Sequence, residues 1–354
     1  MFNEQHYKIL REKVDALPRV NLADLPTPLH EVPSLSEELG PRIFFKRDDL
    51  TGLALGGNKT RMLEFRLIHA LEEGADAVVT GYGVQSNHAR QTAAACSKLG
   101  LECHLVLTGD GSDSYYPQGN LLLDEVLGAN VTIINGSTAE QKKLIEQTAA
   151  DLQDEGKNAF ITGVEDYDLS AVAYVDGMLE IANQLKTEGV NPDYVFVSSE
   201  GSTQAGLEVA AKYLELEPEI VGITPMKQIS KPWRKTDITA EISRIANVVI
   251  DRFELDISIE RNEITNLSQY VGKGYGIGTE EGRESIELVA RKEGILLDPC
   301  YTGKAMAGLL DQIRSGRVSS DDTVLFLHTG GFPLIFAYSD FLGQPIRPYG
   351  KNIS

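Results

Sequence analysis

The sequence predicts an α/β protein built on open, mostly parallel β-sheets. From residue 61 onward, apolar residues at helical spacing alternate with short runs rich in β-branched residues, which is the pattern of strand–helix–strand units. The 354 residues are enough for about two domains of roughly 150 residues each. Hydrophobic residues make up 42% and charged residues 24% of the chain, which favours a folded protein over disorder or a fibrous repeat.

The first series of elements, residues 61–153, accommodates four strand–helix units. Apolar spacing predicts a half-buried helix over 62–71 that ends at Gly74, and the glycines of 81–83 form a turn before the next helix. The other elements expected there are strands near 77–80, 103–108 and 131–134, and helices from about 87, over 118–127 and over 138–153.

A second series of elements follows the polar stretch 154–168. Strands are expected at 194–197, 220–224 and 324–328, and a helix is expected after Thr203. The polar stretch is either a crossing between two layers or one surface loop. No internal repeat or low-complexity tract is present, which excludes solenoid and linker architectures.

Charge and cysteine content exclude several classes of function. Lys and Arg number 33 against 52 Asp and Glu, a net charge of −19, so neither nucleic acid nor an anionic membrane is expected as a partner. Cys96, Cys103 and Cys300 form no CxxC pair, which indicates neither a disulfide framework nor a metal site. Because the sequence shows neither a signal-peptide pattern nor a long apolar run, a cytoplasmic protein is expected.

The most informative segment is Gly56-Gly57-Asn58-Lys59-Thr60-Arg61. Two glycines let the backbone approach a ligand, and Lys59 opens a helix. Burial and the positive end of the helix would both lower the pKa of this lysine, so that its neutral amine can attack a carbonyl. Alone, the hexapeptide favours a solvated lysine in an ordinary turn, and the other segments are needed to favour a reactive one.

Two further segments join the end of a strand to the start of a helix, where ligands collect in open α/β sheets. In the first, Ser86 and Asn87 are suited to hold a carboxylate at a helix start, and Gln85 adds a donor. In the second, Ser198 to Gly206, backbone amides and hydroxyls are suited to a phosphate, although neither a Walker lysine nor GxGxxG is present. Simple helix capping is the alternative interpretation of both segments.

Polar side chains also lie beside glycines in three C-terminal segments. These contain Tyr275 between two glycines, Tyr301 within Asp298 to Lys304, and Thr329 within His328-Thr329-Gly330-Gly331. A tyrosine is most often a packing residue whose hydroxyl finds a partner. The two tyrosines therefore become catalytic candidates only in combination with the other segments.

Together, these motifs resemble the pyridoxal-phosphate (PLP) enzymes of the tryptophan-synthase-β fold type, in the branch with D-cysteine desulfhydrase and 1-aminocyclopropane-1-carboxylate (ACC) deaminase. The resemblance covers nearly the whole chain in order, through LPTPL (25–29), KRDD (46–49), GGNKTR (56–61), QSNHARQTAA (85–94), GSTQAG (201–206), GYGIGTEEG (274–282), LLDPCYTGKAMAGL (296–309) and HTGG (328–331). It implies fold type II, with two open twisted parallel-sheet domains, the cofactor between them, and a homodimer. The small domain would be 61–171, inserted in a large PLP-binding domain of 1–60 and 172–354.

The resemblance also implies roles for individual residues. Lys59 would hold PLP as a Schiff base. The implied catalytic residues are Lys59, Ser86, Tyr275 and Tyr301. The implied cofactor-binding residues are Lys59, Asn58, Asn87, Gly201, Ser202, Thr203, Gln204, Ala205, Gly206 and Thr329, and the implied substrate-binding residues are Gln85, Ser86, Asn87 and His88.

Two threonines favour one reaction within this branch. The deaminases carry Glu where this chain has Thr302, and tend to have Leu where it has Thr329. A carboxylate at the ring nitrogen makes PLP a strong electron sink, whereas a hydroxyl only shares a hydrogen bond. A weaker sink suits elimination of a good leaving group, so the expected substrate is a small amino acid, with D-cysteine giving pyruvate, ammonia and sulfide. The alternatives are ACC deamination to α-ketobutyrate, cysteate sulfo-lyase activity, or a catalytically altered cofactor-binding relative.

Two positions depart from the family pattern. Met62 stands where many relatives have a second lysine, and Glu200 stands where a small or uncharged residue is usual. Both changes remove positive potential near a phosphate. Altered cofactor affinity or an altered substrate is therefore expected.

Overall fold

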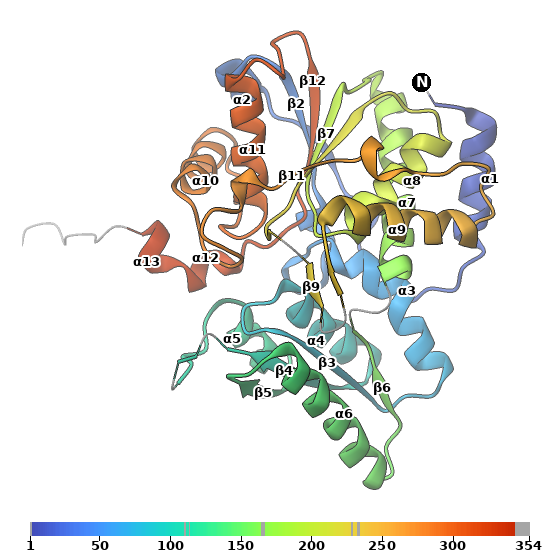
Figure 1. The fold of residues 1–354 in the computed structure, drawn as a ribbon, viewed down its shortest axis with the longest axis vertical. Coiled ribbons are helices and arrows are strands. Elements are labelled where there is room, and N and C mark those ends of the chain that lie inside the picture. Colours follow the sequence, from blue (N-terminus) through green and yellow to red (C-terminus); the bar gives the residue numbers. More distant parts are fainter. Residues whose placement is uncertain are drawn as a thin grey trace, which may run out of the picture.

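The computed structural model describes residues 2–109, 111–112, 114–163, 167–227, 229–231 and 234–343, and its larger sheet has six strands (Figure 1). The strand order is β1 (Leu29–Glu31), β2 (Arg42–Lys46), β12 (Thr323–Leu327), β7 (Tyr194–Ser198), β8 (Glu219–Ile223) and β11 (Thr265–Leu267). Only β1 pairs antiparallel with its neighbour; the other pairs are parallel. The predicted α/β fold with mostly parallel sheets is confirmed.

The second sheet has four parallel strands and lies below the first in Figure 1. Its order is β5 (Asn130–Ile134), β4 (Glu102–Thr108), β3 (Ala77–Gly83) and β6 (Ala159–Ile161). The helices expected beside it are α3 (Lys59–Glu72), α4 (Asn87–Leu99), α5 (Gly119–Val126) and α6 (Thr138–Asp154). Strand β6 falls within the polar stretch 154–168, which was interpreted as a crossing between layers or a surface loop. Residues 164–166 of that stretch lie outside the described residues.

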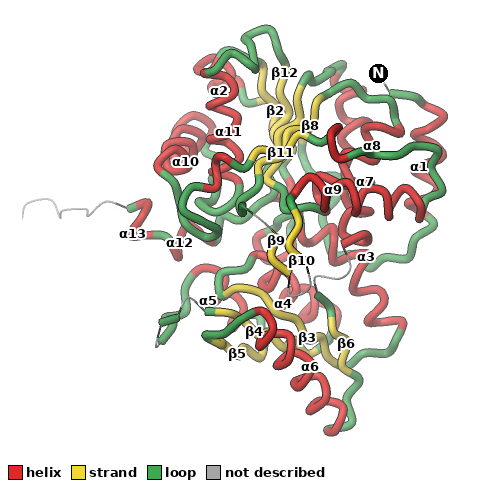
Figure 2. The backbone as a smooth tube through the Cα atoms, in the orientation of Figure 1, coloured by secondary structure: helices red, strands yellow, loops and turns green. Residues whose placement is uncertain are grey.

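Helices cover both faces of the six-stranded sheet (Figure 2). They are α1 (Glu4–Asp15), α2 (Pro33–Leu39), α7 (Tyr167–Glu188), α8 (Ser202–Tyr213), α9 (Ile238–Arg252), α10 (Glu280–Glu293) and α11 (Thr302–Arg314). Two short helices, α12 (Leu334–Ala337) and α13 (Ser339–Leu342), lie to the side of the sheet (Figure 1), and α12 packs against α5. A short antiparallel ribbon, β9 (Ile229–Lys231) and β10 (Arg234–Thr236), completes the elements described. Among all the residues that the structure describes, no helix is long and apolar enough to cross a membrane.

Strand β12 shows how the two faces of the sheet are filled. Leu325 and Leu327 pack into the core beneath α1, α7, α8 and α9, whereas Val324 and Phe326 pack into the core beneath α2, α10 and α11. This alternation follows from the two-residue period of a strand. A central strand buried on both faces therefore carries an unbroken apolar run, as the sequence predicted.

Helix α3 contributes to the cores on both sides of the boundary between the sheets. Met62 and Phe65 belong to the core of the larger sheet, and Leu63 and Leu67 to the core of the smaller one. The helix is therefore held between the two sheets, and Lys59 at its first position points toward the space between them.

A buried charge cluster fixes the start of α3. The Arg61 guanidinium donates to Asp48 at 2.9 Å and to Glu180 at 2.9 Å, and Lys46 also bonds Glu180. Arg61 is 1% exposed and Asp48 is 1% exposed. The sequence suggested Arg61 as a cation that offsets the charge of Glu200, but its guanidinium is instead paired with Asp48 and Glu180 in the interior of the fold.

Candidate active site

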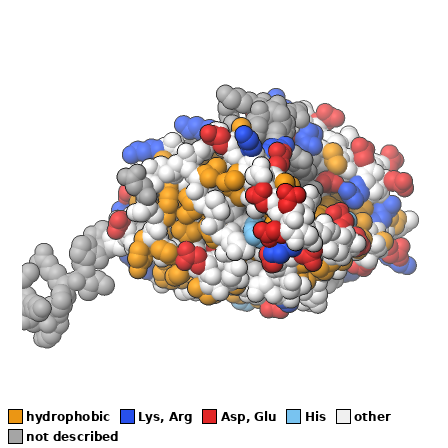
Figure 3. Space-filling model, turned by 90° about the horizontal axis from the view of Figure 1, so that it is seen from below, with side chains coloured by type: hydrophobic (Ala, Val, Ile, Leu, Met, Phe, Trp, Pro, Cys, Tyr) orange, Lys and Arg blue, Asp and Glu red, His pale blue; other side chains and the backbone are white. Residues whose placement is uncertain are grey.

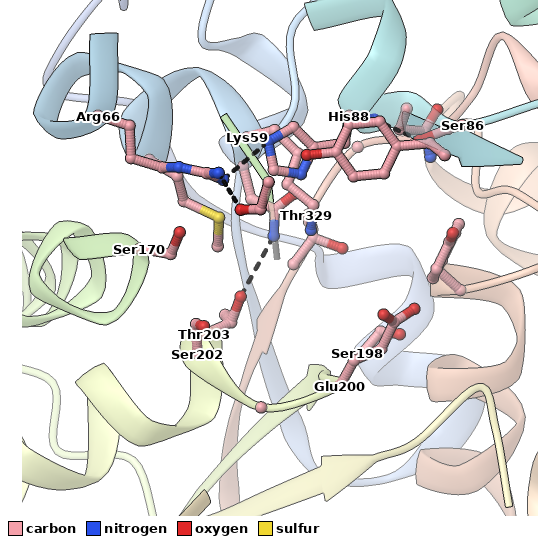
Figure 4. Close-up of a pocket in the computed structure, with 18 of the residues that line it drawn as sticks. Lys59, Arg66, Ser86, His88, Ser170, Ser198, Glu200, Ser202, Thr203 and Thr329 are labelled. Carbon is pink, nitrogen blue, oxygen red and sulfur yellow. Dashed lines mark hydrogen bonds between the residues drawn. The ribbon is translucent and has the colours of Figure 1, made fainter. Parts of the chain in front are cut away.

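A cavity of about 220 Å³ lies where the starts of α3, α4 and α8 meet the loop after β12 (Figure 4). Most of the residues singled out in the sequence come together here. The predicted residues that line it are Asn58, Lys59, Ser86, Asn87, His88, Gly201, Ser202, Thr203, Tyr275, Tyr301 and Thr329. In the described part of the chain, no cluster of three or more His, Cys, Asp or Glu side chains is arranged to hold a metal ion, and all three cysteines are buried and unpaired.

Lys59 follows a turn whose backbone conformation at Gly57 favours glycine. Gly57 has φ +124°, and a Cβ there would lie 2.7 Å from the side-chain nitrogen of Gln91. The turn is also tied to Thr51, whose hydroxyl accepts from the Gly57 N–H at 2.8 Å. Burial lowers the pKa of Lys59, the Arg66 charge lowers it further, and the Glu200 charge opposes the shift. The lowered pKa increases the share of neutral amine, which is the form that acts as nucleophile or base.

The first turn of α8 forms a site for an anion. The Ser199 hydroxyl accepts from the N–H groups of Gly201 at 3.2 Å and Gln204 at 3.1 Å. No described residue accepts a hydrogen bond from the N–H groups of Ser202 and Thr203, which border the cavity. Free N–H groups and the positive end of the helix dipole together favour a phosphate at this point.

Three of the predicted cofactor-binding residues lie behind that turn. The Gln204 side chain donates to the Thr265 carbonyl at 2.9 Å and accepts from Asn266 at 2.8 Å. Ala205 is buried, and a Cβ on Gly206 would lie 2.1 Å from the Ala171 carbonyl. These positions are needed for packing, and none of the three lines the cavity.

Asn120, on α5, is a residue that the sequence analysis missed. Its side-chain amide donates to the Asn87 side-chain oxygen at 2.8 Å and to the Gln85 carbonyl at 2.9 Å. Because the side-chain oxygen of Asn87 accepts this hydrogen bond from Asn120, the side-chain N–H groups of Asn87 are left for other partners. Gln85, a predicted substrate-binding residue, lies outside the cavity lining and bonds the Gln118 carbonyl and the Asn120 N–H, both at 3.0 Å.

Ser86 and His88 hold the start of α4. The Ser86 hydroxyl accepts from the His88 N–H at 3.1 Å as an N-cap. The His88 ring stacks on Tyr82, with centroids 4.5 Å apart. Burial, then the charges of Arg66 and Lys59, hold the pKa of His88 well below its ordinary value, so the ring is neutral at physiological pH.

Arg66 brings positive charge to the same wall. It lies one helical heptad after Lys59 on α3, lines the cavity, and meets His88 at 3.2 Å and Thr162 at 2.8 Å. The i, i+7 spacing was a usable sequence signal, because such residues share one face of a helix. Ser170, which also lines the cavity, lies on α7, a helix that was not predicted.

The two tyrosines form one hydrogen-bonded pair on the cavity wall. The hydroxyls of Tyr275 and Tyr301 bond each other. Burial and the nearby Glu200 charge raise the pKa of both tyrosines above the ordinary value. Both hydroxyls therefore keep their protons at neutral pH. The Glu200 carboxyl also lines the cavity, and burial raises its pKa against the opposing charge of Lys59.

The two threonines of the sequence argument have different positions. Thr302 is fully buried outside the cavity lining, and its hydroxyl donates to Asp298 at 2.7 Å. Thr329 lines the cavity, and its carbonyl accepts from the Asn58 N–H at 3.0 Å. Next to it, a Cβ on Gly330 would lie 2.7 Å from the Gly57 Cα, so two glycine backbones are in close contact beside Lys59.

Comparison with known proteins gives consistent results. Residues 20–330 match the family model described as pyridoxal-phosphate dependent enzyme. The chain is 38% identical over 335 residues to the D-cysteine desulfhydrase of Klebsiella pneumoniae (strain 342), covering 94% of this chain and 99% of the relative.

Solved structures agree with the sequence relatives. A crystal structure of an ACC deaminase homologue matches with a TM-score of 0.83 and 34% identity, covering 94% of this chain and 98% of that one. A pyridoxal 5'-phosphate-dependent aspartate racemase matches over 92% of this chain and 94% of its own, with a TM-score of 0.64 and 17% identity, which shows a shared fold. The chain belongs to the pyridoxal-phosphate dependent enzymes.

Proposed function

We propose that the protein is a PLP-dependent carbon–sulfur lyase that converts D-cysteine and water to pyruvate, ammonia and hydrogen sulfide. The observation that carries this proposal is the Lys59 amine in a cavity bounded by a helix N-terminus and by a pair of protonated tyrosines. The 38% identical D-cysteine desulfhydrase supports the choice of substrate.

The residues present fit the cofactor. Lys59 is placed to hold its aldehyde carbon, and the N–H groups of Ser202 and Thr203 to hold its phosphate. Asn87 and Thr329 supply donors for the polar atoms of the ring. The glycines beside Lys59 let the two backbone segments pack closely against each other, which a side chain would prevent. When bound, PLP stabilises negative charge on the substrate Cα.

The side chains of the chain itself can perform the proton transfers. The Lys59 amine would serve as the base for the substrate Cα proton, because its lowered pKa favours the neutral form. The Tyr275–Tyr301 pair can donate a proton to the departing sulfur, because both hydroxyls stay protonated. Elimination breaks the Cβ–S bond, and water then releases ammonia and pyruvate.

Product analysis tests the proposed reaction. The purified protein is supplied with D-cysteine, L-cysteine, ACC and cysteate in separate assays for sulfide, keto acids and sulfite. We expect sulfide and pyruvate from D-cysteine. Formation of α-ketobutyrate from ACC would instead identify a deaminase, and sulfite from cysteate would identify a sulfo-lyase. Cofactor binding without turnover of any of them would indicate a catalytically altered relative.

Replacing the tyrosines one at a time should show which hydroxyl is the acid. The variant that loses the proton donor, Tyr301→Phe or Tyr275→Phe, is expected to lose kcat on the order of 100-fold with D-cysteine. A better leaving group needs no proton, so β-chloroalanine should restore most of the rate in that variant. Equal small losses in both variants, with either substrate, would contradict an acid role.

We further infer a homodimer, a cytoplasmic location, and a small domain of residues 61–171 inserted in the rest. The separate sheet formed by β3, β4, β5 and β6 supports the division. Figure 3, which views the molecule from below, shows hydrophobic side chains gathered on one part of this face. The large apolar residues exposed on α5 and on α12, which packs against it, are Leu122, Val126 (73% exposed) and Phe336 (63% exposed).

Sedimentation or light scattering tests the dimer. The protein should have twice the mass of one chain, and Val126→Asp should convert it to monomers, because a charge would be buried in an apolar interface. Gln153→Asp, an exposed change on α6, is the matched control. A monomeric wild-type protein would refute the inference.

A further inference from the structure

The geometry points to Glu200 as a specificity-determining residue that makes the substrate end of the cavity reject amino acids with an anionic β-substituent. This inference deepens the proposed function and rests on it for the placement of the substrate. It favours a thiol or another neutral leaving group over the sulfonate of cysteate, one of the alternatives the sequence left open.

The cavity has two ends of opposite charge. Figure 4 shows Arg66 and Ser170 on one side, with Ser202 and Thr203 near them, and Glu200 beside Ser198 on the other side. The cationic end coincides with the first turn of α8, where free N–H groups suit the cofactor phosphate. The anionic end is therefore left for the other part of the ligand.

Glu200 lies near the groups expected to meet the leaving group. Glu200 lines the same cavity as Tyr275 and Tyr301. Its charge contributes to the raised pKa of both tyrosines and of the Cys300 thiol. No described residue forms an ion pair with Glu200, and the Lys59 charge opposes the rise in its pKa that burial causes.

Glu200 lines the cavity and is exposed, so water weakens the repulsion of an anion at this end without removing it. At the effective dielectric constant of about 20 found near a protein surface, a like charge about 4 Å away still changes affinity by about tenfold or more. A carboxylate and a carboxamide have nearly the same shape and differ in charge. A comparison of the two therefore distinguishes electrostatic selection by Glu200 from steric selection.

A binding experiment with two matched pairs tests this electrostatic selection. The ligands D-aspartate and D-asparagine differ by one charge, and so do the wild-type protein and its Glu200→Gln variant. Dissociation constants for the holoenzyme are read from the change in its visible absorbance at about pH 8.5, above the ordinary range of carboxyl pKa values. Glu217→Gln, an exposed change of equal charge just after α8, is the control, and Glu200→Ser is a second variant.

We expect wild-type protein and Glu217→Gln to bind D-asparagine at least tenfold more tightly than D-aspartate. Glu200→Gln and Glu200→Ser should reduce this ratio at least fivefold. The kinetic counterpart is a rise of about tenfold in kcat/KM for cysteate relative to β-chloroalanine in Glu200→Gln.

Two results would overturn the inference: a ratio that the Glu200 variants leave unchanged, or wild-type protein that binds D-aspartate as tightly as D-asparagine. If neither amino acid binds, the cysteate-to-β-chloroalanine ratio decides in the same way. The binding measurement requires no sulfide release. If the protein releases no sulfide but still binds D-asparagine more tightly than D-aspartate, the proposed reaction is refuted and the inferred role of Glu200 is not.

Discussion

Lys59→Ala is expected to reduce kcat with D-cysteine by roughly 1,000-fold or more and to remove the visible absorbance of the cofactor bound to lysine. Two contributions are lost together, because the same amine holds the cofactor and is placed to take the Cα proton. The purified variant is compared with wild-type protein by visible spectroscopy and by sulfide release.

Two controls test whether the loss of activity comes from the missing amine at position 59 or from a change in charge or folding. Lys59→Arg keeps a positive charge at the start of α3 but offers no amine for a bond to carbon, so it should be as inactive as Lys59→Ala. Lys98→Ala, at the other end of α4, removes an amine far from the cavity lining and should retain activity. A Lys59 variant that keeps both the visible band and full turnover would refute the assignment.

Arg61→Ala is expected to lower the free energy of unfolding by about 3–5 kcal/mol, in the presence or absence of cofactor. Burial alone would raise the pKa of Asp48, but the Arg61 guanidinium outweighs it and the pKa lies below its ordinary value. Without Arg61, this carboxylate and Glu180 would keep Lys46 as their shared cation. Urea unfolding of the apoprotein measures the loss.

An exposed pair provides the comparison for this prediction. Arg291 pairs with Glu287 at 2.7 Å, but its side chain is 75% exposed, so Arg291→Ala should cost about 1 kcal/mol or less. The stability supplied by the lowered pKa of Asp48 is present above the ordinary Asp pKa of about 3.9 and lost as the pH falls below it. A loss for Arg61→Ala no larger than that for Arg291→Ala would contradict the buried cluster.

The elements that the sequence predicted well are those with a clear period. Strand β12 and helix α6, for example, match the expected ranges within about one residue. Helix α7 was missed because its residues from Ala171 to Val175 are all buried, so it shows no polar face. Strand β6 was missed because it has only three residues within a polar stretch.

The site was predictable to the extent that each motif carries its own chemistry. The starts of α3, α4 and α8 meet at one cavity, as the ends of parallel strands require. Asn120 was not predictable, because its link to Asn87 joins two helices across 33 positions. The interpretation of Thr302 needed correction, because a residue type does not reveal that its hydroxyl is turned to Asp298 and away from the ligand.

The departures from the family pattern also required the structure. Met62 lines the cavity where many relatives have lysine, and Arg66, one turn further along α3, brings a cation to the same wall. Glu200 is exposed and lines the cavity. Neither outcome follows from the sequence, since both depend on how α3 and α8 approach each other.

Borohydride reduction of the purified holoenzyme, followed by peptide mapping, tests the central claim most directly. We predict a visible absorbance band that reduction abolishes, with the reduced cofactor attached to the peptide that contains Lys59. Attachment to a different lysine, or no band after addition of pyridoxal phosphate, would contradict the proposed site.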